Sequence, residues 1–182
     1  VDVIGAAEHH GALPYPAFVA LINDPRFETR FRSYGRHQVL DFNVTGPILG
    51  ELAVRQAIDA AIDRRSLVNT HLGGIPDAEN TLYPTLQDWD RGPTPISGSR
   101  YDPQLATALL ESAGWLQSEA PGVRYRGDTA LRVRLLVNKQ ESNALAAARF
   151  VAGALVKVGF QVDLEALPGA LISERLQSGN FD

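Results

Sequence analysis

The stretch LRVRLLVNKQESNALAAARFVAGALVKVGFQVDLEAL, residues 131–167, decides the fold. Its first seven residues are apolar at every odd position and include two arginines, Arg132 and Arg134, a pattern typical of a strand with one buried face. Ser142 to Val158 has apolar residues at helical spacing, and Gly159 is a typical helix stop. Residues 160–165 alternate again. Strand, helix and strand with tight connections predict a βαβ unit, with two parallel strands joined by a right-handed crossover.

This unit also predicts which side chains share a face of the sheet. If the two strands are parallel neighbours, Arg132 and Arg134 should lie on the same face as Asp163 and Glu165. The apolar residues that alternate with them should be buried on the other face, and they are Leu131, Val133, Leu135, Phe160, Val162 and Leu164.

A capped helix precedes the βαβ unit. Asp102 can accept hydrogen bonds from free helix amides, and Pro103 suits the first helical position. We expect the apolar stripe of this helix at Leu105, Leu109 and Ala113. Gly114 followed by Trp115 is typical of a glycine stop with a hydrophobic contact behind it.

Two further helices are predicted at residues 51–62 and 64–72. The stripe of the first helix is Val54, Ala57, Ile58 and Ala61. Asp63 should end the first helix and cap the second, because continuation would stack Asp59 and Asp63 near the negative end of the helix dipole. Within the first helix, Glu51 with Arg55 and Arg55 with Asp59 have the spacing of favourable ion pairs.

The remaining segments are less regular. We expect a strand at residues 1–6, a helix at 14–23, and a hairpin of two strands at 29–34 and 37–44. Several Pro and Gly residues predict an irregular surface excursion over 73–101. The chain begins as if within a strand and ends in SGNFD, so we expect it to be a piece of a longer protein.

Composition excludes several classes of function. The chain has 45% apolar and 21% charged residues, the mixture of an ordinary globular protein. Its net charge of −4, without a basic block, argues against nucleic acid as a partner. It has no Cys, so disulfides, thiolate metal sites and Cys nucleophiles are excluded. No apolar run approaches the roughly 20 residues of a membrane span. Glycine-rich phosphate loops and common hydrolase or zinc motifs are absent, so no cofactor is predicted.

Five segments in the same order resemble one protein family. LAVRQAIDAAIDRRSLV, residues 52–68, resembles the helix signature of the solute-binding proteins that serve ABC importers of peptides, nickel and related solutes. VLDFN at 39–43, YDPQLATALLESAGW at 101–115 and the βαβ run at 135–167 resemble the segments that the family has beside this signature. LQSGNFD at 176–182 resembles the family's approach to the return crossing between lobes.

The resemblance implies a fold and a function. The fold would be α/β, a mixed twisted sheet with flanking helices, forming one lobe of a two-lobed periplasmic-binding-protein-like structure over residues 1–182. Residues 1–6 and 179–182 would be crossing strands to the missing first lobe of the same protein. The whole protein would be a periplasmic receptor, or an extracellular one anchored to the membrane, that closes on a peptide or similar solute and delivers it to ABC permease subunits.

Sheet topology indicates where a ligand would bind. In open α/β sheets, ligands lie outside the carboxyl ends of parallel strands. Those ends are Asn138, Lys139 and Gln140 after the first strand, and Leu167, Pro168 and Gly169 after the second. Asn138 offers the donors and acceptor that a reader of carboxylates or peptide backbones needs. An ordinary turn or capping asparagine is the alternative.

Two further residues are candidates. Asn43 ends the strand before the helix pair and is a candidate for the hinge; its alternative is a strand-ending asparagine that bonds local backbone. Trp89, with Tyr83, is a candidate lip over the cleft, and its alternative is packing of the irregular segment onto the lobe.

Other functions stay open at this point. Glu8, His9 and His10 are the one cluster with metal-like character, but adjacent histidines point apart and no third ligand is suitably spaced. A small α/β hydrolase that uses this cluster is one alternative. An interaction module that signals to a membrane sensor is the other.

Overall fold

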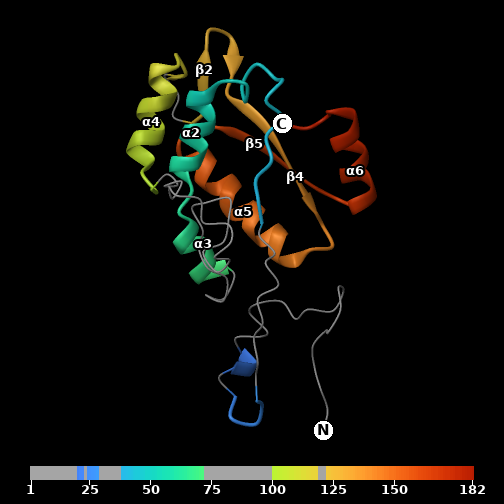
Figure 1. Cartoon of the computed structure of the whole chain (residues 1–182). Coiled ribbons are helices and arrows are strands. Elements are labelled where there is room, and N and C mark those ends of the chain that lie inside the picture. Colours follow the sequence, from blue (N-terminus) through green and yellow to red (C-terminus); the bar gives the residue numbers. More distant parts are fainter. Residues whose placement is uncertain (1–19, 23, 29–37, 72–99, 119–121) are drawn as a thin grey trace, which may run out of the picture.

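The computed structural model describes residues 20–22, 24–28, 38–71, 100–118 and 122–182 (Figure 1). Residues 20–22 are helical, and the rest of the helix predicted at 14–23 lies outside the described residues. The strands predicted at 1–6 and 29–34 also lie outside them. Of the irregular segment expected at 73–101, only Arg100 and Tyr101 are described.

The βαβ unit forms as predicted. It consists of β4 (Arg132–Asn138), α5 (Ser142–Lys157) and β5 (Gln161–Leu167). The two strands are parallel, with Arg134 opposite Asp163 and Leu135 opposite Leu164. Charged residues of both strands therefore share one face, and Arg132 forms an ion pair with Asp163 across it. The predicted register is confirmed.

Burial of the apolar face is only partly as expected. Leu131, Val133 and Phe160 are buried, whereas Leu135, Val162 and Leu164 are half-buried. The reason lies in the size of the sheet. Among the described residues β4 pairs with β5 alone, so side chains in the middle of this narrow sheet are covered by α5 without further strands beside them.

The helix α4 (Pro103–Ser112) begins and ends where the sequence predicts. The Asp102 carboxylate accepts from the N–H groups of Gln104 at 3.0 Å and Leu105 at 2.9 Å. Gly114 has a φ of 84°, and the Trp115 N–H donates to the Leu110 carbonyl at 2.9 Å, so the chain turns and buries the indole.

The stripe expected on α4 is displaced by one residue. The helix buries Ala106 and Leu110, whereas Leu105 is 45% exposed. Asp102 fixes this rotation, because its main-chain N–H donates to the Ala60 carbonyl at 2.8 Å and so sets the face that α4 turns toward α2 (Leu52–Ala61). The predicted stripe of α2 is fully buried.

The break between α2 and α3 (Arg64–His71) is made by Asp63 as predicted. Its carboxylate accepts from the Ser66 N–H at 2.9 Å. The ion pairs predicted within the first helix do not form. Arg55 donates instead to the carbonyls of Leu49 at 2.7 Å and Gly50 at 2.9 Å. Both carboxylates are engaged by other arginines, Glu51 by Arg126 and Asp59 by Arg64, so Arg55 bonds the carbonyls of the preceding turn.

The two acids left by Arg55 find other partners. Asp59 pairs with Arg64, the first residue of α3, and Glu51 pairs with Arg126 at 2.6 Å. The first contact links α2 to α3, and the second links the start of α2 to Arg126, which is distant in sequence.

A second, antiparallel sheet was not predicted. It is formed by β1 (Leu116–Gln117), β2 (Arg124–Arg126) and β3 (Thr129–Ala130). Arg124 is only 4% exposed and donates to the carbonyls of Val158 and Trp115 at 2.9 and 3.0 Å. The α/β class is confirmed, with parallel and antiparallel strands in two separate sheets.

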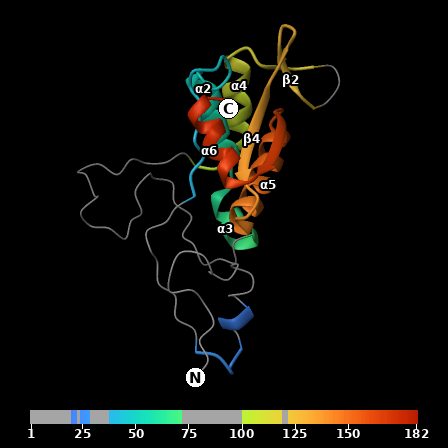
Figure 2. The ribbon, with the colours of Figure 1, turned by 90° about the vertical axis from the view of Figure 1, so that its right-hand side faces the viewer.

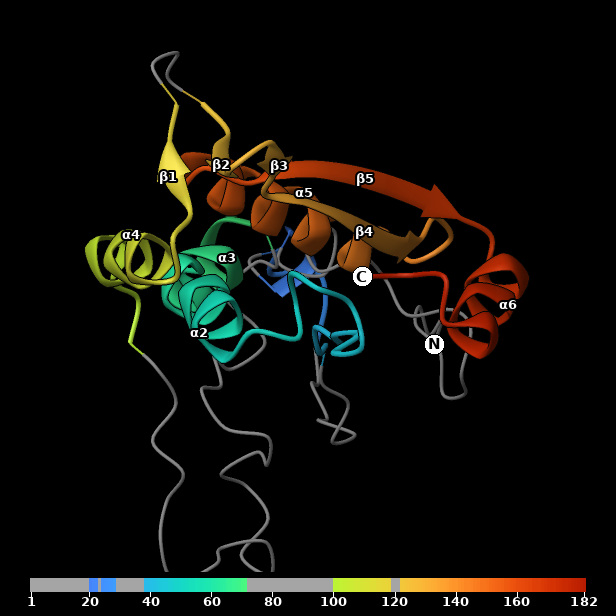
Figure 3. The same ribbon diagram turned by 90° about the horizontal axis from the view of Figure 1, so that it is seen from above.

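The helix α5 packs against both strands of the parallel sheet, whereas α6 (Gly169–Ser178) contacts β4 and buries no residue. In Figure 2, α5 lies on one side of β4 and α6 on the other, next to the chain end at Asp182. The core lies between α2, α4, α5 and the sheet, and its largest fully buried side chains are Trp115, Phe160, Leu110, Leu131 and Val54. Figure 3 shows α6 apart from α2 and α4, across the segment that ends at Asp182.

The strand predicted at 37–44 is not formed over its described part. Residues 38–43 have no strand assignment, and residue 44 begins a turn. The strand does not form because this segment has only one backbone hydrogen bond to a neighbouring segment. Asn43 donates its N–H to the Asp182 carbonyl at 2.7 Å, and a strand needs a series of such bonds.

Candidate binding site

The carboxyl ends of the two parallel strands meet as expected. Asn138 is the register partner of Leu167, and the Lys139 N–H donates to the Leu167 carbonyl at 2.9 Å. Pro168 is half-buried, and Lys139 and Gln140 are exposed. The six residues predicted at this edge therefore lie together, three at the carboxyl end of each strand.

The side chain of Asn138 forms local bonds. Its Oδ1 accepts from the Gln140 N–H at 3.1 Å, and its Nδ2 donates to Glu141 Oε1 at 3.0 Å. These contacts form the turn before α5, so Asn138 is an ordinary turn asparagine, which is one of the alternatives foreseen for this residue. A primary amide has two N–H groups and two acceptor lone pairs, so one donor and one acceptor position remain for a ligand.

Gly169 brings α6 close to Asn138. A Cβ at Gly169 would lie 3.4 Å from Asn138 Nδ2, so a larger residue would crowd the asparagine. The preceding Pro168 supplies no side-chain hydrogen bond to the helix. No side chain therefore caps the first N–H groups of α6, and a helix N-terminus favours negative or carbonyl oxygen atoms.

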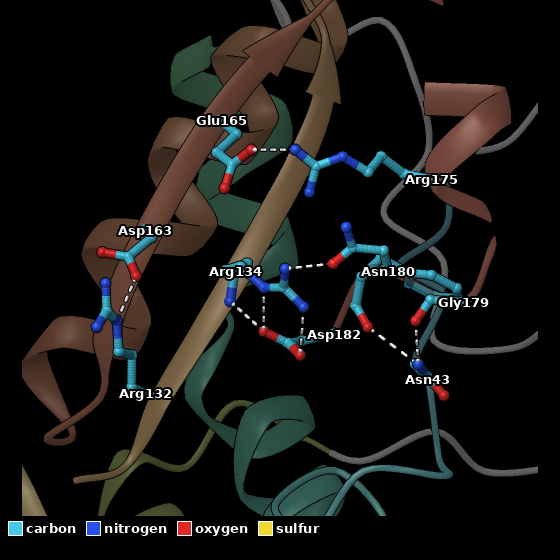
Figure 4. A network of polar contacts seen from close by, with 10 residues as sticks. Asn43, Arg132, Arg134, Asp163, Glu165, Arg175, Gly179, Asn180 and Asp182 are labelled. Atoms are coloured by element: carbon cyan, nitrogen blue, oxygen red, sulfur yellow. Dashed lines mark hydrogen bonds and ion pairs between the residues drawn. The ribbon is translucent and has the colours of Figure 1, made fainter. Parts of the chain in front are cut away.

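A second polar cluster lies beside β4 and was not predicted (Figure 4). The Asp182 carboxylate accepts from the Arg134 N–H at 2.8 Å and from Arg134 Nε at 3.1 Å. Arg134 Nη1 donates to Asn180 Oδ1 at 2.7 Å. Burial raises the pKa of Asp182, but the hydrogen bonds from Arg134 outweigh burial and leave that pKa below its ordinary value. The same contact raises the pKa of Arg134.

Asn43 belongs to this second cluster. Its Nδ2 donates to the carbonyls of Gly179 and Phe181, both at 3.0 Å, and its Oδ1 accepts from Thr45 Oγ1 at 2.6 Å. Asn43 was expected either at the hinge or as an asparagine that bonds local backbone. Its side chain does bond backbone, but the bonded carbonyls are more than 130 residues later in the chain. Asn138 is four residues beyond Arg134 on β4, about 13 Å at the usual strand rise. The structure therefore does not bring Asn43 to the strand-end site.

The outward face of β4 and β5 is electrically balanced. Arg132 pairs with Asp163, Arg134 with Asp182, and Arg175 of α6 with Glu165 at 3.8 Å. These arginines are consequently matched by acids, and the one cation among the predicted edge residues is Lys139. The described edge can bind polar or partly anionic groups through amides, helix N–H groups and this single ammonium.

Several predicted features lie outside the described residues. They are Trp89 and Tyr83, the candidate lip, and Glu8, His9 and His10, the metal-like cluster. Within the described ranges, no group of three or more His, Cys, Asp or Glu residues could hold a metal ion. No described helix is long and apolar enough to cross a membrane.

Comparison with known proteins shows which family the chain matches. Residues 9–182 match the family described as bacterial extracellular solute-binding proteins, family 5 Middle. The nickel-binding periplasmic protein of Escherichia coli K12 is 28% identical over 174 residues, 95% of this chain and 33% of that protein. Di/tripeptide-binding protein 1 of Pseudomonas aeruginosa is 31% identical over 103 residues, 56% of this chain and 19% of that protein.

A solved structure agrees in fold. NikA from Brucella suis, in complex with Fe(III)-EDTA, has a TM-score of 0.72 and 28% identity, covering 77% of this chain and 28% of that one. The chain thus spans about a third or less of the length of these relatives.

Proposed function

Because the chain belongs to family 5 of the bacterial extracellular solute-binding proteins, we propose that it is one lobe of the receptor of an ABC importer. The receptor captures a peptide or similar solute non-covalently between this lobe and a second one, and hands it to permease subunits in the membrane. The observation that supports this most is the family match, which extends over residues 9–182 and includes both strand ends of the candidate site.

The geometry of the strand-end site agrees with half of a binding cleft. Its polar groups are few and exposed on one side, as expected where a second surface completes the contact. Asn138 keeps one donor and one acceptor, Lys139 adds a charge, and Gly169 leaves the start of α6 uncovered by a side chain. A peptide or a compact chelate offers the carboxylate and carbonyl oxygens that such groups bind.

The proposal includes no chemical conversion of the solute. The relatives described above are binding proteins by their names, and the E. coli relative is periplasmic. We therefore propose an extracytoplasmic receptor, either periplasmic like that relative or extracellular and anchored to the membrane. The hydrolase and sensor-module alternatives rest on sequence alone, and no described residue favours them.

The decisive experiment uses the complete receptor. The protein is expressed, the solute that copurifies with it is identified by mass spectrometry, and the stripped protein is titrated calorimetrically with di- and tripeptides, longer peptides and nickel complexes of histidine. We expect micromolar or tighter binding of one class without turnover. Hydrolysis of a peptide during the titration, or no binding in any class, would contradict the proposal.

A further inference from the structure

The acid at the start of α5 bonds a neighbouring side chain instead of capping its own helix. Glu141 occupies the N-cap position of α5, where its side chain forms no capping hydrogen bond. Glutamate is not among the residues preferred at this position, which are Ser, Thr, Asp and Asn. Its carboxylate accepts instead from Asn138 Nδ2 at 3.0 Å, and it forms no ion pair with a described residue. Helix capping and ion pairing therefore do not account for Glu141, whose described partner belongs to the candidate site.

This contact fixes the orientation of the Asn138 amide. The Oδ1 atom accepts from the Gln140 N–H at 3.1 Å, and Nδ2 donates to the Glu141 carboxylate. If the amide were reversed, a donor would face the Gln140 N–H and an acceptor would face the carboxylate, so both hydrogen bonds would be lost. Glu141 therefore determines on which side of Asn138 the NH2 group lies.

The second N–H of Asn138 is available beside the start of α6. The Nδ2 atom has no other hydrogen bond to a described residue. Apart from its chain neighbours, a Cβ at Gly169 would meet no described side chain other than Asn138, whose Nδ2 would lie 3.4 Å away. Lys139 is on the other face, because its main-chain N–H continues the ladder to Leu167 and side chains alternate along a strand. The charge nearest to this N–H is therefore that of Glu141.

This charge decides which acceptor binds well to the second N–H. Two acceptors on one NH2 group lie about 5 Å apart, given N···O distances of about 3 Å and a trigonal nitrogen. Two negative charges about 5 Å apart repel each other enough to weaken binding about fourfold in bulk water, and more where water is excluded. A neutral carbonyl oxygen does not suffer this repulsion. A carboxylate is therefore disfavoured at Asn138 relative to a carbonyl.

We propose that Glu141 is a specificity-determining residue of the cleft, which makes Asn138 bind a neutral carbonyl oxygen of the solute and discriminate against a carboxylate. Glu141 acts through Asn138 and needs no contact with the solute. This inference rests on the proposed function, because it concerns the solute at the same site. The part of the solute at Asn138 is then an amide or peptide group, and any carboxylate of the solute binds elsewhere in the cleft.

Two small probes test the proposal in the complete receptor without knowledge of the solute. The protein is isotopically labelled at asparagine, and the NMR signals of the Asn138 NH2 group are identified by their absence from Asn138→Ala. N-methylacetamide should shift the signal of the N–H that is not bonded to Glu141, and it should bind more tightly than acetate. Tighter binding of acetate at this N–H overturns the proposal. Absence of any shift with N-methylacetamide does so as well, because the N–H is then not available.

A matched pair of variants tests whether the charge of Glu141 is the cause. Glu141→Gln keeps an acceptor of the same length but removes the charge, so the dissociation constant of acetate should fall at least about fourfold relative to that of N-methylacetamide. Glu174→Gln, at an exposed acid in the middle of α6, is the control and should leave this ratio unchanged. An unchanged ratio in Glu141→Gln, or equal changes in the two variants, would show that Glu141 only shapes the turn.

Failure of this inference can be distinguished from failure of the proposed function. Neither probe is a candidate solute, so both report on Asn138 whether or not the receptor binds a peptide. If the receptor binds a solute tightly and the charge effect is absent, the role of Glu141 is wrong and the proposed function stands. If the charge effect is present and no solute binds in calorimetry, the proposed function is wrong and the selectivity of Asn138 stands.

Discussion

The carboxylate of Asp182 binds both the main-chain N–H and the guanidinium of Arg134, 48 residues earlier in the chain. The Asp182 carboxylate thereby accepts a main-chain N–H at the edge of β4 and neutralises the Arg134 guanidinium. It also holds residues 179–182, which follow α6, against β4. Asn43 fixes the same segment from the other side through the carbonyls of Gly179 and Phe181.

Removal of the charge at this contact should reduce stability. Asp182→Asn keeps the shape but loses the charge-assisted bonds, and both partners are about one-third exposed. We expect the free energy of unfolding to fall by about 1 kcal/mol at pH 7, as urea denaturation would show. Asp163→Asn is the control: its partner Arg132 is 59% exposed, so the loss should be below about 0.5 kcal/mol. Equal losses would mean that the Asp182 contact is an ordinary surface pair.

The same contact predicts a dependence on pH. The pKa of Asp182 in the folded protein is below its ordinary value, so the folded state binds this proton more weakly than the unfolded state. Its stabilisation is then complete above the ordinary aspartate pKa near 4 and is lost as pH falls through the lower folded pKa. The difference between wild type and Asp182→Asn, followed by urea denaturation from pH 7 to pH 2.5, should be constant at first and shrink below about pH 4. A difference that grows on acidification would contradict this assignment.

Gly159 should tolerate no side chain. Its φ is 104°, and a Cβ there would lie 2.5 Å from Cγ of the buried Arg124. Gly159→Ala combines left-handed backbone strain with displacement of hydrogen-bonded Arg124, so we expect a loss of about 2–4 kcal/mol. Gly179→Ala is the matched control, with a φ of 68° and nothing within 4 Å, and should cost about 1 kcal/mol. Similar midpoints in thermal unfolding would show that Arg124 moves aside freely.

The break between α2 and α3 offers a simpler test. Asp63→Ala removes the acceptor of the Ser66 N–H and should lower the free energy of unfolding by about 1 kcal/mol. Asp63→Asn should cost much less, because asparagine also caps helices well. If both variants melt like the wild type, the cap contributes nothing to stability.

Local patterns predicted much of this fold. Apolar residues at the odd positions from Leu131 to Val137 predicted which side chains of β4 and β5 share a face, and Asp102 and Asp63 marked helix starts because capping depends on neighbouring residues only. The rotation of α4 could not be predicted in this way, since it depends on a bond between Asp102 and Ala60. The helix α6 was missed because it buries no residue and so has weak apolar periodicity.

The residues of the candidate site also fall into those that the sequence predicts and those that it does not. The strand-end residues from Asn138 to Gly169 could be predicted, because the carboxyl ends of parallel strands must meet. The contact of Asn43 with residues 179–181 could not, since the bonded groups are backbone carbonyls more than 130 positions away and have no sequence signature. For Arg134, alternation gave the face of the sheet but could not distinguish Asp182 from Asp163 as its partner.

The last prediction concerns affinity and follows from the half-cleft. A receptor with micromolar affinity has a binding free energy of about −8 kcal/mol. If two lobes contribute comparable contacts, one lobe retains about −4 kcal/mol, a dissociation constant near millimolar. Closure of the two lobes also excludes water and strengthens each polar contact with the solute. The single lobe should therefore lose at least half of the binding free energy.

Residues 1–182 should accordingly fold as a stable soluble lobe and bind no peptide tightly, whereas the complete receptor should bind its solute at least about a hundredfold better. Calorimetry on both proteins with the same peptides decides this, with tryptophan fluorescence as a second readout. Cooperative unfolding of residues 1–182 is the control that separates a weak half-site from a lobe that has not folded. Submicromolar binding by residues 1–182 alone would mean that Asn138, Lys139 and their neighbours form a complete site, because half of a shared contact set cannot supply that free energy.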